Sequence, residues 1–127
     1  MADLRSPLAR VRGLGSAKEG THHWWAQRLT ALALIPLTIW FVVSLIAHTG
    51  ADHAAAAAWV GSLWPAALLI LTVVLTFHHG QLGLQVVIED YVHNEALKIA
   101  GILAVKGLAL LLSVVAIAAI ARIAIGG

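Results

Sequence analysis

Four residues in the second half of the chain have the types and spacing expected for a cofactor and a substrate: His79, Gly83, Asp90 and Tyr91. A helix turns about 100° per residue, so His79, Gly83 and Asp90 would lie within about 40° of one another on one face. At about 1.5 Å per residue, Asp90 and Tyr91 are about 16 to 18 Å from His79 along the axis. In a membrane-crossing helix, the imidazole would lie in hydrocarbon and the carboxyl and phenol groups at its edge. A cofactor would then bind deep and a substrate shallow.

The composition indicates that lipid surrounds this chain. Of its 127 residues, 61% are hydrophobic and 11% are charged, and the mean hydropathy is +0.91. These values are wrong for a water-soluble domain and typical of one small domain made of membrane spans. The sequence has no cysteine, which excludes disulfides, Fe–S ligation and a cysteine-based zinc site within the chain. The net charge of +2 is too small to indicate nucleic-acid binding.

The elements that must position the four residues are three transmembrane helices, so the predicted fold is an all-α integral membrane protein. Uncharged stretches long enough to cross a bilayer define the helices. We predict a basic tail over residues 1–20 and a membrane anchor domain over residues 21–127, with spans at about 26–48, 64–88 and 98–122.

The segments between the spans also carry structural signals. Thr21 is expected to cap the first helix, and Pro36 to kink it. The apolar stretch that contains the second span is too long for one crossing, so residues 54–60 are predicted to form an interfacial turn of helix. Residues 89–98 are predicted to form a short polar connection.

The lysines and arginines predict the orientation. The inner side would carry Arg5, Arg10, Arg12, Lys18, Arg28 and Lys98, and the outer side would carry Arg122. Positive charge flanking membrane spans stays in the cytoplasm, so in a bacterial inner membrane we expect a cytoplasmic N-terminus and a periplasmic C-terminus. The tail is expected to act mainly through this rule, although it could also bind acidic lipid or a partner subunit.

The histidine pair His78 and His79 is the first candidate for function. A histidine in an apolar span is costly unless it is paired or ligating a metal. The structural alternative is an imidazole hydrogen-bonded to a neighbouring helix. Gly83, one turn from His79, favours ligation because a missing side chain leaves space for a flat macrocycle such as haem. No other histidine of this chain would reach the same depth and face, so a second subunit would have to supply the other iron ligand.

The inner edge of the membrane is the second candidate region. His22, Arg28, Asp90 and Tyr91 would meet there if the first two spans are neighbours. A phenol and a carboxyl group could donate a hydrogen bond and relay protons to a carbonyl that is reduced to an alcohol. Arg28 could stabilise developing negative charge or a haem propionate. The structural alternative is that these residues anchor helices at the headgroups.

Lys106 interrupts the third span and has no predicted catalytic role. Its amine could extend to the inner surface or pair with Glu89 or with an acidic residue of a partner.

Two motifs together resemble a known family. The spacing His79-x3-Gly83-x6-Asp90-Tyr91 and residues 20–31 (GTHHWWAQRLTA) resemble the smaller hydrophobic membrane anchor subunit of succinate dehydrogenase, complex II. Residues 83–92 (GLQVVIEDYV) look most like the alphaproteobacterial and mitochondrial versions. The larger, cytochrome b556-type anchor carries Arg-Pro-x-Ser-Pro-His and Ser-x-x-His-Arg-x-Thr-Gly stretches that this chain lacks.

The resemblance implies a shared haem b. The family's motif histidine, here His79, is an axial ligand of a haem that lies between the two anchors. His79 is chosen over His78 because it lies eleven residues before Asp90 and four before Gly83. His22 matches a first-span position near the haem edge.

The resemblance also implies a ubiquinone-reduction site. Tyr91 would hydrogen-bond a ubiquinone carbonyl, Asp90 would organise the site and its proton supply, and Arg28 would lie near the quinone. The expected partners are the larger cytochrome b-type anchor, which packs with this chain into a helical bundle, and a flavoprotein and an iron–sulfur subunit on the cytoplasmic side. These soluble subunits oxidise succinate to fumarate, and the chain alone should have no activity.

Two other functions stay open at this point. The chain could be a structural membrane adaptor whose histidines serve helix packing. It could also be a self-contained b-type cytochrome, a homodimer that uses His79 twice. Bound quinone and co-purifying soluble subunits would separate complex II from both.

Overall fold

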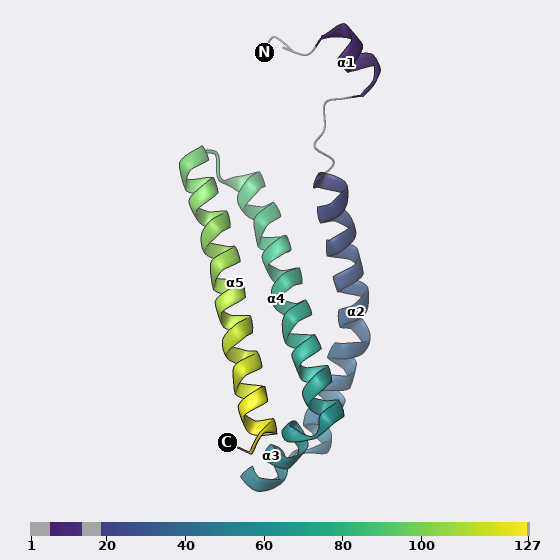
Figure 1. Ribbon diagram of the computed structural model, residues 1–127, viewed down its shortest axis with the longest axis vertical. Helices are drawn as coiled ribbons and strands as arrows, with labels where there is room; N and C mark the ends of the chain where they lie inside the picture. Colours follow the sequence, from purple (N-terminus) through teal and green to yellow (C-terminus); the bar gives the residue numbers. More distant parts are fainter. Residues whose placement is uncertain (1–5, 14–18, 127) are drawn as a thin grey trace.

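The computed structural model describes residues 6–13 and 19–126, and within these ranges the secondary structure is entirely helical. The helices of the described residues are α1 (Pro7–Val11), α2 (Glu19–Ala47), α3 (His53–Gly61), α4 (Leu63–Tyr91) and α5 (Glu95–Ala124), labelled in Figure 1. Of the predicted tail, Arg5 and Lys18 lie outside the described residues. Within the predicted basic tail, residues 7–11 form α1, about one turn and a half of helix.

The three long helices are those able to cross a membrane. They have 29, 29 and 30 residues, and their most apolar segments have mean hydropathies of 2.4, 1.6 and 2.5. At about 1.5 Å per residue each is longer than the hydrocarbon core, which is about 30 Å thick. The predicted all-α membrane fold with three spans is therefore confirmed. The short helix α3 occupies the position predicted for the interfacial turn.

The three spans form an open layer with α4 in the middle. α2 and α5 both pack on α4, and within the described chain they do not pack on each other (Figure 1). His79 of α4 contacts α2, whereas Ile88, about 180° further round α4, lies against Gly101 of α5. We call the end of the layer where α2 begins, α4 ends and α5 begins the Tyr91 end. α3 closes the other end by packing on α4 and α5.

Two helix boundaries differ from the sequence prediction. α4 continues through Glu89 to Tyr91, so the connection is residues 92–94 rather than 89–98. The prediction was wrong because it ended the helix where the apolar run ends, although a helix can continue into polar surroundings. Here Gln85 donates a hydrogen bond of 2.8 Å to Glu89 one turn later. α2 begins at Glu19, so Thr21 lies inside the helix and is not its cap.

Side chains cap two other helices. The Asp52 carboxylate accepts a hydrogen bond from the Ala55 N–H at 2.8 Å and begins α3. The Asn94 side chain accepts one from the Leu97 N–H at 3.0 Å and begins α5. Each bond satisfies a backbone donor that has no partner within its own helix. The Asn94 cap allows the chain to reverse within three residues, which keeps α4 and α5 adjacent.

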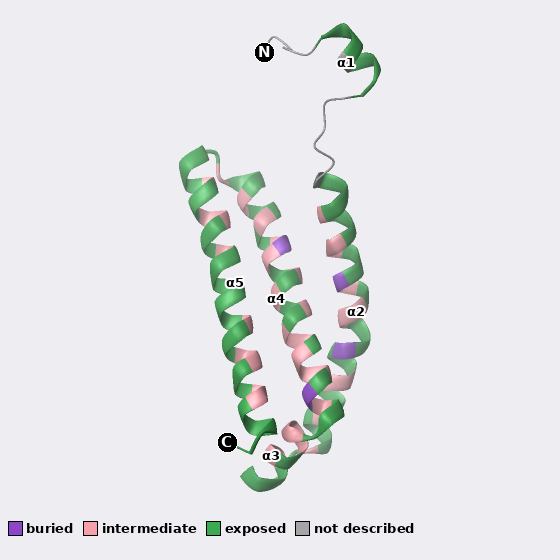
Figure 2. Cartoon of the chain, viewed as in Figure 1, coloured by how far each residue is buried: buried purple, intermediate pink, exposed green. Residues whose placement is uncertain are grey.

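The layer has almost no interior. Among the described residues only Thr30, Leu37, Ala66 and Leu82 are buried, and Figure 2 shows exposed residues along the outer faces of all three spans. In water these apolar faces would have to be covered, whereas in a bilayer lipid or another membrane subunit covers them. The fold therefore positions its functional groups on helix faces, not in an enclosed core.

Candidate functional site

His79 lies where α2 and α4 meet and is hydrogen-bonded across the contact. Its Nδ1 is 3.0 Å from Oγ1 of Thr30, the one buried polar residue of the described chain, with 7% of its surface exposed. Thr30 Oγ1 also lies 2.6 Å from the carbonyl oxygen of Ala26. A hydroxyl has one hydrogen, and the short contact between two oxygens requires that this hydrogen lie between them. The hydroxyl therefore accepts a hydrogen bond from His79 Nδ1–H.

This arrangement determines which nitrogen of a neutral imidazole carries the proton. A neutral histidine that carries its proton on Nδ1 presents an unprotonated lone pair on Nε2. That is the form in which histidine binds a metal, and a hydrogen bond to the other nitrogen is its usual support. The contact with a neighbouring helix, which sequence analysis treated as the alternative to ligation, uses only Nδ1 and leaves Nε2 available.

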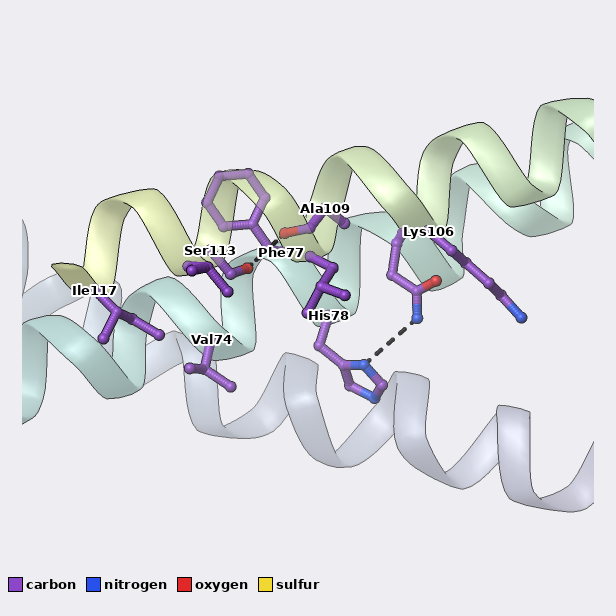
Figure 3. A pocket seen from close by; sticks show the side chains of 10 residues that line it. Val74, Phe77, His78, Lys106, Ala109, Ser113 and Ile117 are labelled. Atoms are coloured by element: carbon purple, nitrogen blue, oxygen red, sulfur yellow. Dashed lines mark hydrogen bonds between the residues drawn. The ribbon is translucent and has the colours of Figure 1, made fainter.

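The donor set fits a single axial ligand. No group of three or more histidine, cysteine or carboxylate side chains gathers anywhere in residues 6–13 or 19–126, so the described chain has no complete metal site of its own. His78 points elsewhere: it is exposed, and its Nδ1 is 3.5 Å from Gln81 Nε2, in the groove between α4 and α5 shown in Figure 3. The described residues therefore offer His79 as one candidate metal ligand, with no second ligand gathered beside it.

A cleft of about 450 Å³ separates α2 from α4 near the Tyr91 end. Its lining consists of Gly20, His23, Trp24, Gln27, Arg28, Gly83 and Val86. A Cβ added at Gly83 would meet Gln27 Nε2 at 3.6 Å, an ordinary contact, and nothing else within 4 Å. Packing within the described chain therefore gives no reason for a glycine here, which favours the prediction that the space serves something bound. Arg28 lies 4.5 Å over the Trp24 ring, a cation–π contact that holds its guanidinium at this cleft.

The predicted residues at the membrane edge fall into separate groups. Asp90 follows Gly83 and Val86 at helical spacing, so it lies on the side of α4 that lines this cleft. Tyr91 is 79% exposed, and among the described residues no hydrogen bond or ion pair joins it to Arg28 or Asp90. His22 instead lines a different cavity, with Gln85, Glu89 and Lys106. The structure thus brings Arg28 and Gly83 together, with Asp90 about two turns beyond Gly83 on the same side of α4, and puts His22 in the other cavity.

Sequence reasoning missed three residues of this region. Thr30 is 49 positions from His79 and could be found only from the packing register of α2 on α4. His23 and Gln27 line the cleft with Arg28, and the buried atoms His23 Nε2 and Gln27 Oε1 have no hydrogen-bond partner among the described residues. Buried polar atoms are normally satisfied, so these two favour a ligand or partner with hydrogen-bonding groups. Their spacing of four residues on α2 was the available signal.

Known proteins agree with this architecture. The family profile "Succinate dehydrogenase/Fumarate reductase transmembrane subunit" matches residues 2–121. The chain belongs to this family. It is thus a multi-pass membrane subunit of a larger complex, and the resemblance found in the sequence is confirmed.

Individual relatives match over most of their length. A Rickettsia bellii protein named "Succinate dehydrogenase hydrophobic membrane anchor subunit" is 34% identical over 124 residues, which cover 93% of this chain and 94% of the relative. A Paracoccus denitrificans protein of the same name is 34% identical over 100 residues, 79% of this chain and 78% of the relative. The "Succinate dehydrogenase membrane anchor subunit" of Reclinomonas americana is 27% identical over 96 residues, 73% and 80% of the two chains. No solved structure matches the chain.

Proposed function

We propose that this chain is the small hydrophobic membrane anchor of a succinate:ubiquinone oxidoreductase, in which it ligates haem b through His79 and forms one wall of the ubiquinone-reduction site. Family membership and the names of the relatives support the anchor role. The observation that carries the ligand proposal is the Thr30–His79 hydrogen bond, because it leaves Nε2 free to bind iron.

His79 and Gly83 would hold the haem from this side. His79 Nε2 would bind the haem iron, and the larger cytochrome b-type anchor would supply the second protein ligand. Gly83 leaves space beside the macrocycle, and His23 and Arg28 border that space. When bound, haem b supplies a one-electron redox centre within the membrane. Thr30 keeps the ring oriented and its proton on Nδ1. His22, which lines the other cavity, has weaker support as a haem-edge residue.

The polar residues of the Tyr91 end would serve quinone reduction. Ubiquinone takes two electrons and two protons to become ubiquinol, and the electrons come from succinate through the flavoprotein and iron–sulfur subunits. The Tyr91 phenol donates a hydrogen bond to a quinone carbonyl, Asp90 passes protons from the aqueous side, and Arg28 stabilises negative charge on the oxygen. Because Tyr91 is 79% exposed here, the rest of the site must come from other subunits.

The orientation follows from the charged residues. Arg10, Arg12, Arg28 and Lys98 belong to the Tyr91 end or to the chain that precedes it, whereas Arg122 lies near the end of α5. The positive-inside rule then gives a cytoplasmic N-terminus and Tyr91 end, and a periplasmic C-terminus, in the bacterial inner membrane. This orientation puts the quinone site on the side where succinate is oxidised.

The decisive experiment compares the wild-type complex with His79→Ala and His78→Ala. The reduced-minus-oxidised visible spectrum and succinate–quinone reductase activity are measured on the same purified samples. We expect a low-spin b-type signal that His79→Ala removes or shifts and His78→Ala preserves. Quinone reduction without any haem signal in the wild type would reject the ligand assignment alone. Haem without soluble subunits would support a homodimeric cytochrome, and loss of haem, quinone and subunits together would support a structural adaptor.

A further inference from the structure

A second groove is lined by residues of α2, α4 and α5, adjoins the cleft at Gly20 and His23, and changes polarity along its length. Two adjoining cavities, of about 600 and 510 Å³, share the lining residues Gln81 and Lys106, and we call the two together the Lys106 groove. The part nearer the Tyr91 end is polar, lined by His22, His23, Gln85 and Glu89. The deeper part is mostly apolar, lined by Val74, Phe77, Leu110, Val114 and Ile117 beside His78 and Ser113.

Lys106 stands at the boundary between the two parts. It is eleven residues into α5 from Glu95, about 17 Å along the axis. Helical side chains tilt toward the N-terminus, and in Figure 3 the Lys106 side chain extends toward the earlier residues of α5, that is, toward the Tyr91 end. The amine forms no ion pair with the described residues, whereas Lys98 nearer the start of α5 pairs with Glu95 at 2.9 Å. Because Lys106 lies within a span and makes no ion pair here, an anionic group bound in the groove would stabilise its ammonium.

Glu89 and Gln81 also lie along the change in polarity of the Lys106 groove. Glu89 lies two turns nearer the Tyr91 end than Gln81, and its carboxylate accepts a hydrogen bond from Gln85. The polar part therefore holds a carboxylate and an ammonium that form no ion pair with each other, and the apolar trough continues from Gln81 and Lys106. His22 and His23 are the other titratable groups at the polar end, and His78 adjoins the trough.

We propose that the Lys106 groove binds a zwitterionic phospholipid whose headgroup carries a primary amine. Its amine contacts Glu89, its phosphate contacts Lys106, the Gln81 amide donates to the ester region, and one acyl chain fills the trough. The two opposite charges of the polar part complement the ammonium and phosphate of an aminophospholipid headgroup, and the apolar trough adjoins them as an acyl chain adjoins its headgroup. A partner's transmembrane helix with one carboxylate would pair with Lys106 but would leave Glu89 without a cationic partner. An anionic lipid would bring a second negative charge to Glu89.

The test uses the complex purified in detergent through a tag on this chain, stripped of lipid and then titrated with dioleoyl phosphatidylethanolamine or dioleoyl phosphatidylglycerol. Native mass spectrometry counts the retained lipid. We expect Lys106→Met to weaken phosphatidylethanolamine binding about tenfold, as expected for one lost charge-assisted hydrogen bond. Lys106→Arg should retain binding. Glu89→Gln should remove the preference for phosphatidylethanolamine over phosphatidylglycerol.

Two controls keep the result interpretable. Lys98→Met removes a lysine from the same helix outside the groove and should bind lipid as the wild type does. Leu110→Trp fills the apolar trough and should exclude the acyl chain while Lys106 remains. Equal lipid retention by wild type and Lys106→Met would overturn the proposal, and so would loss of another subunit in Lys106→Met, which would identify a docked helix. The haem spectrum is recorded on the same samples. A missing haem signal would count against the haem proposal, and the lipid counts alone decide the lipid proposal.

Discussion

Replacing Thr30 by valine tests whether its hydroxyl prepares His79 to bind iron. Valine matches threonine in shape but cannot accept the hydrogen bond from Nδ1–H, which is 3.0 Å long here. The contact is nearly sealed from solvent, since Thr30 is 7% exposed, so no water replaces the lost acceptor. An unsatisfied buried donor costs about 1 to 3 kcal/mol, and loss of a group that supports a metal-bound histidine lowers metal affinity about 10- to 100-fold. We expect Thr30→Val to lower haem affinity about 10- to 100-fold.

The assay is haem retention during dilution, together with the haem reduction potential from a spectroscopic redox titration. Loss of the hydrogen bond makes the imidazole a weaker donor to iron, and weaker donation stabilises the reduced state, so the potential of any retained haem should rise. Thr30→Ser keeps the hydroxyl and should behave as the wild type. A purely structural role for Thr30 would lower the thermal stability of both variants and leave the potential unchanged. Wild-type affinity and potential in Thr30→Val would refute the reasoning.

Three further substitutions probe other parts of the chain. Gly83→Leu should fold and assemble but lower haem content, measured from the visible spectrum, because it fills the cleft one helical turn from His79. Gly83→Ala, whose Cβ makes only an ordinary contact with Gln27, separates the effect of side-chain bulk from that of the backbone. Tyr91→Phe should lower succinate–quinone reductase activity about 10- to 100-fold, and an unchanged rate would contradict the proposed hydrogen bond to quinone. Asn94→Ala should lower stability by about 1 kcal/mol through loss of the α5 cap, seen as a lower thermal unfolding midpoint with an unchanged haem spectrum.

The membrane layout could be predicted from the sequence because hydropathy reports directly on burial in lipid. The three spans, the interfacial helix α3 and the shared helix of His79, Gly83 and Asp90 all follow from apolar length and helical period. Helix ends were less predictable: a change in hydropathy marks where lipid meets water, whereas α4 ends only at Tyr91, beyond that boundary.

Contacts between the spans could not be predicted from the sequence. The partnership of Thr30 with His79 depends on how far α2 is shifted and rotated against α4, and no local pattern encodes that register. The same register decides that His23, and not His22, lines the cleft with Arg28. The roles of these residues toward haem and quinone remain predictions for the experiments above.

The open layer of α2, α4 and α5 affects how many copies of this protein can accumulate in a cell. A protein with so few buried residues draws most of its stability from what covers its faces, so that stability depends on the concentration of the covering partner. A copy made in excess of its partners presents unpaired polar groups to lipid and loosely held helices to membrane proteases. Degradation of such surplus copies would match the amount of this chain to that of its partners without any dedicated regulator.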